Sequence, residues 1–161
     1  MGEHADSVLS PDELLAELSA AARPEELPAR IARCRAVLAA TSREEALGFW
    51  ADLQETLGLL LTRLAVHGTA VEEAAIEAFE EAAAAFLEAG DREGWAGASA
   101  NLANIYRTRQ TDRTAGLYKA LLLLEGALPE LESEEMRIPR AQLLINLANV
   151  YSEIPEGEQT I

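Results

Sequence analysis

Two asparagine pairs are the residues whose types and spacing best suit binding chemistry. Asn101 and Asn104 lie in the stretch Asn-Leu-Ala-Asn-Ile-Tyr, which returns 45 residues later as Asn-Leu-Ala-Asn-Val-Tyr with Asn146 and Asn149. Amide side chains donate and accept hydrogen bonds, so they can pair with a peptide backbone, and the guanidinium of Arg107 can pair with a carboxylate. The chemistry expected from this pattern is recognition of another polypeptide.

These polar residues divide into two expected roles. Asn101 and Asn146 directly precede the apolar Leu, and we favour a structural role, in which they bond the backbone of a neighbouring helical turn, over direct binding. The side chains expected to reach a partner are Asn104, Arg107, Gln142 and Asn149.

Patterns for catalysis or metal binding are missing from the sequence. His4 and His67 have no second His at helical spacing and no cysteine nearby, so a zinc site lacks ligands. No Gly-rich phosphate loop or nucleophile with its base can be assembled. The adjacent acid pairs point different ways on a helix and are expected to be solvated; they are Glu44-Glu45, Glu72-Glu73 and Glu80-Glu81. We expect no enzymatic activity, metal or cofactor; a catalytic domain would lie outside this chain.

The composition favours one acidic, all-helical unit. The chain has 161 residues, of which 49% are hydrophobic, and its net charge is −15. Such a charge repels a phosphate backbone, and the basic stretches are short; they are Arg30, Arg33, Arg35 and Arg107, Arg109, Arg113. We expect no nucleic-acid binding. The acidity serves solubility or favours a basic protein partner.

Cys34 is the only cysteine, so no intrachain disulfide can form, and a reducing cytoplasm fits best. It lies on an apolar helical stripe, where a buried structural thiol is favoured over a reactive one. The N-terminus has no basic signal region, and no apolar run reaches the roughly 18 residues of a membrane span. We therefore expect neither secretion nor membrane insertion.

Three segments are expected along the chain. Residues 1–9 form a disordered tail, and 10–40 form an N-terminal helical pair that caps the array. The first of these helices begins with Ser10 as N-cap and Pro11 at the first helical position, and ends near Ala22. The second covers 25–40. Repeats occupy 41–161, in units of about 43–89, 92–131 and an incomplete 134–161.

Each full unit is expected to be a pair of helices, and the third unit only one. The first helix of unit one covers 42–64, and the second ends at Ala89-Gly90-Asp91. Pro129 is expected to end or kink the second helix of unit two near Leu128. The third unit offers an apolar face of Leu143, Leu144, Leu147, Val150 and Tyr151. Without a second helix this face is exposed, so we expect a fragment of a longer protein or an end that pairs with another element.

Residues that recur at the 45-residue interval are expected to form the core of the repeat. Trp50 and Trp95 occupy equivalent places, for which packing is favoured over a stacking platform for a ligand. The other structural positions are Leu57, Asn101, Leu102, Tyr106, Ala120, Ala127, Asn146, Leu147 and Tyr151.

With Leu102, Ala103 and Tyr106 in the first helix and Ala120, Leu124 and Ala127 in the second, the unit resembles a tetratricopeptide repeat. Such a repeat has about 34 residues, so this one carries about 11 more. The resemblance implies an all-α fold, in which antiparallel helix pairs stack as a right-handed tetratricopeptide-like solenoid.

The long unit also resembles the repeats that precede CHAT protease-like domains in bacterial multidomain proteins, where an Asn-Leu-Gly-Asn-x-Tyr core is followed by a polar turn. The first unit lacks both asparagines, and residues before 41 do not match. The resemblance implies a scaffold that binds a peptide or partner domain in its concave groove, as sensor or adaptor of a larger bacterial protein. The alternative is a regulatory module that self-assembles through the single C-terminal helix.

Overall fold

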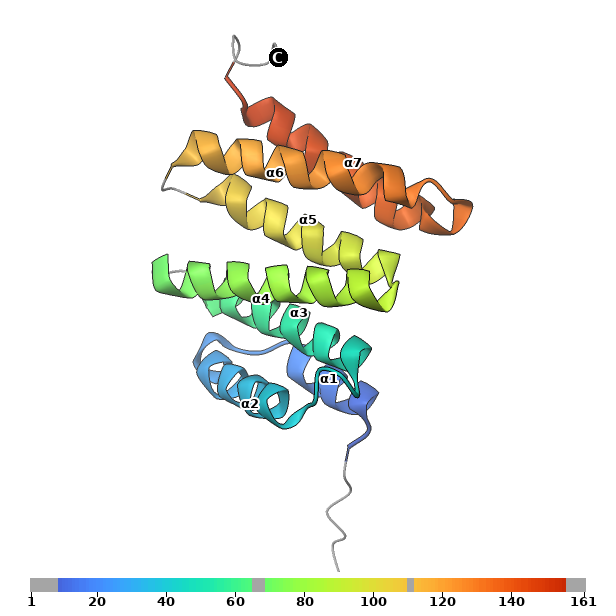
Figure 1. Cartoon of the computed structure of the whole chain (residues 1–161). Helices are drawn as coiled ribbons and strands as arrows, with labels where there is room; N and C mark the ends of the chain where they lie inside the picture. The colour runs from blue at the N-terminus through green and yellow to red at the C-terminus, as the bar shows by residue number, and fades with distance from the viewer. Residues whose placement is uncertain (1–8, 65–68, 110–111, 156–161) are drawn as a thin grey trace, which may run out of the picture.

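The computed structural model describes residues 9–64, 69–109 and 112–155, and these residues form helices and no strand (Figure 1). The all-helical expectation is therefore confirmed for the described part. The α-helices are α1 (Pro11–Ser19), α2 (Leu27–Ala40), α3 (Leu47–Leu64), α4 (Thr69–Ala89), α5 (Arg92–Thr108), α6 (Arg113–Ala127) and α7 (Arg137–Glu153). Three short 3₁₀ helices are η1 (Pro24–Glu26), η2 (Leu128–Leu131) and η3 (Glu134–Met136).

The predicted signals at several helix ends are confirmed. Ser10 caps α1 through a reciprocal box in which its hydroxyl accepts from the Glu13 amide and the Glu13 carboxylate accepts from the Ser10 amide. Gly90 ends α4 with φ of +74°, a conformation that glycine adopts without steric cost. Pro129 removes a backbone donor, so α6 ends at Ala127 and continues as η2.

Two helix boundaries differ from the prediction. The helix expected over 42–64 begins only at Leu47, because Ser42 first forms a turn in which its hydroxyl accepts from the Glu45 amide. The helix expected to reach Ala22 ends at Ser19, whose hydroxyl donates to the Leu15 carbonyl 2.6 Å away. In both places a short hydroxyl side chain competes with the helix for backbone groups.

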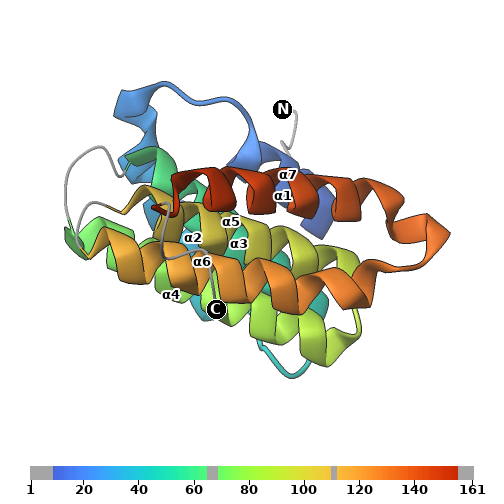
Figure 2. The same ribbon diagram turned by 90° about the horizontal axis from the view of Figure 1, so that it is seen from above.

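The 45-residue interval is visible in the helices themselves. α3, α5 and α7 begin at Leu47, Arg92 and Arg137, one interval apart each time. Neighbours along the chain from α2 to α7 pack on one another, and α5 also contacts both α3 and α7. Seen from above, α4 and α6 lie on one side of the molecule and α7 on the other (Figure 2). The arrangement is thus a helical array that is repeat-like.

The core runs through the whole array. Small residues sit where helices approach closely, and Ala51, Ala82 and Ala98 are fully buried between larger side chains. α1 and α2 pack on α3, and their buried Leu18 and Ile31 belong to the same core as the repeats. None of the helices in the described ranges combines the length and apolar character needed to cross a bilayer.

Candidate functional site

The four residues predicted to bind a partner do not form one cluster. Asn104 and Arg107 lie on α5 and contact each other, since Arg107 donates to the Asn104 side-chain oxygen at 2.8 Å. Gln142 lies toward the beginning of α7, and Asn149 toward its end. The three amides are exposed, whereas Arg107 is half-buried.

Arg107 pairs with a carboxylate of the chain itself and links two helices. Its guanidinium pairs with Glu153 at the end of α7, and Arg113 at the start of α6 reaches the other oxygen of that carboxylate at 2.7 Å. Arg109 pairs with Glu72 and Glu73 of α4. All three arginines of one predicted basic stretch are therefore committed to carboxylates within the chain.

Asn101 has the predicted strut geometry but a different acceptor. Its amide donates to a carboxylate oxygen of Glu55 on α3, 3.2 Å away, and not to a backbone carbonyl. Asn146 is the equivalent residue on α7, but Ala100 occupies the position equivalent to Glu55, so the same bond cannot form. Asn146 is half-buried beside Asn104 and Arg107.

One tyrosine bond recurs with the repeat. The Tyr106 hydroxyl of α5 donates to Glu80 of α4 at 3.3 Å, and the Tyr151 hydroxyl of α7 donates to Glu125 of α6. Both pairs are 26 residues apart, so the equivalence between units extends to individual contacts. Burial, followed by the nearby Glu80, raises the pKa of Tyr106.

Part of the predicted apolar face of α7 is not core. Leu143 and Val150 are buried, but Leu144 is 45% and Tyr151 42% exposed, whereas Tyr106 at the equivalent place is 8% exposed. The difference has a simple cause: α6 covers Tyr106 on α5, and no helix of the described part covers this side of α7. The exposure of Leu144 and Tyr151 agrees with the expectation that this face lacks a covering helix, whereas Leu143 and Val150 are buried. The expected place of Tyr151 in the core of the repeat was wrong.

A second surface emerges where equivalent positions of α3, α5 and α7 lie side by side. We call it the α3–α5–α7 face, and its residues are Gly48, Asp52 and Glu55 of α3, Glu93, Gly97 and Ala100 of α5, and Ile138, Gln142 and Ile145 of α7. A Cβ at Gly97 would lie 3.3 Å from a Glu55 carboxylate oxygen, which places α3 and α5 in close approach here. Between α5 and α7 the face is hollowed by a cavity of about 260 Å³. Ala96, Gly97 and Ala100 line it from one side, and Ile138, Pro139 and Gln142 from the other.

Several carboxylates lie close together at the α3 edge of this face. Burial raises the pKa of Glu55, and the neighbouring charges of Asp52 and Asp91 raise it further, while the Asn101 hydrogen bond lowers it. The pKa of Asp52 is likewise raised by burial, then by Asp91 and Asp12. None of the ion pairs within the described ranges includes these four acids. Like charges gather here, and the residues that the structure describes offer them no basic partner.

Only Gln142 of this face was among the predicted binding residues. The prediction relied on residue types that recur at the 45-residue interval. On this face, however, equivalent positions carry different residue types on each helix. Its positions nevertheless follow the interval: Asp52, Gly97 and Gln142 are one interval apart, and so are Glu55, Ala100 and Ile145.

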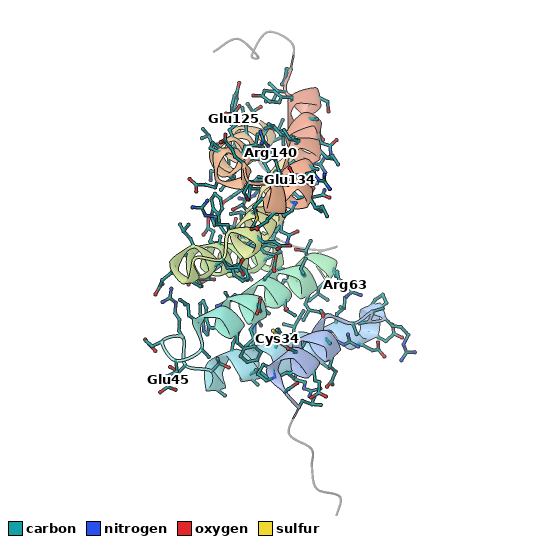
Figure 3. All side chains as sticks on the ribbon, turned by 90° about the vertical axis from the view of Figure 1, so that its right-hand side faces the viewer. Cys34, Glu45, Arg63, Glu125, Glu134 and Arg140 are labelled. Atoms are coloured by element: carbon teal, nitrogen blue, oxygen red, sulfur yellow. The ribbon has the colours of Figure 1, made fainter. Side chains whose placement is uncertain are left out.

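The remaining candidates have structural surroundings. Cys34 is buried against α3 (Figure 3). Its thiol lies 3.4 Å from the Leu53 carbonyl, and burial raises its pKa to about 11. Trp50 and Trp95 are both half-buried against the core, and the Arg43 guanidinium lies 5.4 Å from the Trp50 ring centre.

Metal ligands do not gather in the described part of the chain, where no three His, Cys, Asp or Glu side chains are placed to hold an ion. His4 and His67 lie outside the described residues. Comparison of the chain with models of protein families, with curated proteins and with solved structures finds no match.

Proposed function

We propose that this chain is a non-enzymatic scaffold for protein–protein interactions, built as a right-handed solenoid of tetratricopeptide-like helix pairs. The observation that carries the proposal is the 45-residue register, in which α3, α5 and α7 begin one interval apart and the tyrosine-to-carboxylate bond recurs. When like units stack, the same helix of each unit contributes to one continuous face. Such faces bind extended peptides or helices.

The partner is a protein or peptide, bound on the α3–α5–α7 face. Gln142 belongs to this face, and Asn104 and Asn149 are exposed one turn beyond it on α5 and α7, so all three can offer amide groups to a peptide backbone. Arg107 joins α5 to the end of α7, because its charge is already paired with Glu153. The sensor or adaptor role within a larger bacterial protein rests on the resemblance to repeats beside CHAT domains. A reducing compartment, such as the cytoplasm, suits a single buried cysteine.

A selection of random peptides displayed on phage tests this function. We expect enriched peptides to bind the purified chain. Ala100→Leu should weaken this binding, because the larger side chain would fill the cavity between α5 and α7. Leu122→Ala on the outward side of α6 is the matched control, because Leu122 is exposed and lies outside the face. If no peptide is enriched, or if Ala100→Leu binds as wild type does, the proposed site is wrong.

Self-assembly through α7 is the second candidate function. The observation that favours it is the apolar surface of α7, where Ile138, Leu144 and Ile145 are all exposed. Several exposed apolar side chains on one helix commonly mark a protein interface. Sedimentation velocity separates the two candidates: a dimer that Leu144→Arg abolishes and Leu122→Arg preserves supports self-assembly. A monomer at high concentration removes it.

A further inference from the structure

The α3–α5–α7 face changes character across its three helices. At equivalent positions α3 has carboxylates, Asp52 and Glu55, and α5 has the small residues Gly97 and Ala100. α7 contributes Gln142 with two exposed isoleucines, Ile138 at 78% and Ile145 at 56%. The face is therefore acidic at one edge, lined by small side chains in the middle and apolar at the other edge.

The acidic edge has room for a positive charge. Asp52 and Glu55 lie three residues apart, and so on one side of α3, with Asp12 of α1 and Asp91 before α5 nearby. Burial, and then the neighbouring carboxylates, raise the pKa of Asp52 and of Glu55. The described part of the chain supplies no Lys or Arg to pair with them. A cation from a ligand would relieve this repulsion and make charge-assisted hydrogen bonds, whereas a terminal carboxylate would be repelled.

The apolar edge has room for one side chain. The cavity between α5 and α7 measures about 260 Å³, slightly below the roughly 300 Å³ at which pockets for drug-sized ligands begin. Its floor is made by Ala96 and Ala100, both buried, and its wall by Ile138 and Pro139. An aliphatic side chain fits such a hollow, and a whole helix does not.

Together these features specify a ligand. We infer that the face binds an extended peptide through one Lys or Arg held by Asp52 and Glu55 and one aliphatic side chain seated between α5 and α7. The inference rests on the proposed scaffold function and names its ligand class. The peptide crosses the three helices, so its backbone passes over Gly97, which carries no side chain of its own and lies beside the Glu55 carboxylate.

The peptides enriched on the full chain test this chemistry directly. We expect them to carry Lys or Arg a few residues from Leu, Ile or Val. The double variant Asp52→Asn with Glu55→Gln should weaken an enriched peptide about tenfold or more, since it removes both charges that hold the cation. Glu55→Gln keeps a side-chain oxygen that can accept the Asn101 hydrogen bond, so we expect the variant to fold. Ile138→Ser should weaken the same peptide at a site too exposed to affect folding.

The matched control removes two charges elsewhere. Glu77→Gln with Glu81→Gln neutralises exposed acids of α4. The affinity for the peptide should stay within about twofold of wild type, because salt screens these distant charges. The proposed ligand class would be wrong if the enriched peptides lacked a basic residue near an aliphatic one. It would also be wrong if such peptides bound the Asp52→Asn, Glu55→Gln variant as tightly as wild type. Either result would leave the proposed scaffold function standing. A selection that enriches nothing contradicts the scaffold as well.

Discussion

Gly58 of α3 lies directly beneath the ring of Phe79 of α4, and a Cβ at Gly58 would stand 2.7 Å from Phe79 Cε1. One interval later Ala103 and Leu124 take these positions, and both are fully buried. A larger residue on one helix is thus matched by a smaller one on the other. The two units fill the same space with different pairs of side chains.

Exchange between these pairs tests the equivalence. Gly58→Ala alone should cost about 1 to 3 kcal/mol through overpacking, and Phe79→Leu alone a similar amount through the cavity it leaves. The double variant reproduces the second unit, so we expect it to be more stable than the sum of the single changes predicts. Urea unfolding of the four proteins measures this coupling. If the two single costs simply add, the Gly58–Phe79 and Ala103–Leu124 pairs are not interchangeable in packing.

A glycine on the same helix supplies the control. Gly48 lies in the first turn of α3, and a Cβ added there would meet no other atom within 4 Å. Gly48→Ala should therefore stabilise the chain by about 0.5 to 1 kcal/mol, because alanine loses less backbone entropy in a helix. The same urea unfolding measurement checks this, and a loss of stability would show that the space beside Gly48 is filled.

The two equivalent tyrosines should differ in their effect on stability. Tyr106→Ala empties a buried site and is expected to cost about 3 to 5 kcal/mol. Tyr151→Ala removes a largely exposed ring and should cost about 1 kcal/mol or less. Thermal and urea unfolding of both variants provide the comparison. Equal losses would mean that a further element buries Tyr151.

The acidic edge predicts how stability depends on pH. Folding raises the pKa of Glu55 above 4.5, so the folded state binds this proton more tightly than the unfolded state does. The free energy of unfolding contributed by Glu55 should rise as pH falls from 7 through that pKa, and be lost as pH rises again. Glu13 and Glu26 have lowered pKa values and oppose this trend at lower pH.

Removal of one charge isolates the contribution of Glu55. At about pH 7, Glu55→Gln should be more stable than wild type, and its stability should vary less as the pH falls toward about 5. Glu77→Gln, on exposed α4 surface, should follow wild type. Destabilisation by Glu55→Gln at neutral pH would contradict a carboxylate that burial and its neighbours disfavour.

Cys34 should react only when the chain unfolds. Its thiol is buried and has a pKa raised to about 11, so the reactive thiolate is scarce near neutral pH. A disulfide reagent is expected to label no thiol in the native protein and one in urea, at a native rate that follows unfolding. Fast labelling without denaturant would show an open N-terminal helical pair.

Local signals predicted the parts of the fold that depend on local chemistry. Ser10, Gly90 and Pro129 act on the backbone beside them, so the helix ends they set were readable from the sequence. The start of α3 was not, because Ser42 offers a competing turn. The Glu55 acceptor of Asn101 and the Glu153 partner of Arg107 lie 46 residues away, beyond any local pattern.

The candidate site was predicted less completely for a different reason. Recurrence identifies what every unit needs for packing, such as Tyr106 and Tyr151. A ligand-binding face gains specificity from residues that differ between units, as Asp52, Gly97 and Gln142 do. The interval locates such positions only after the structure shows which side of each helix remains open.

Amide chemical shifts recorded while an enriched peptide is added test the central claim most directly. We expect the largest changes at Asp52, Gly97, Ala100 and Ile138, which span all three helices of the face. Shifts confined to the outward surfaces of α4 and α6, around Ala84 and Leu122, would contradict it.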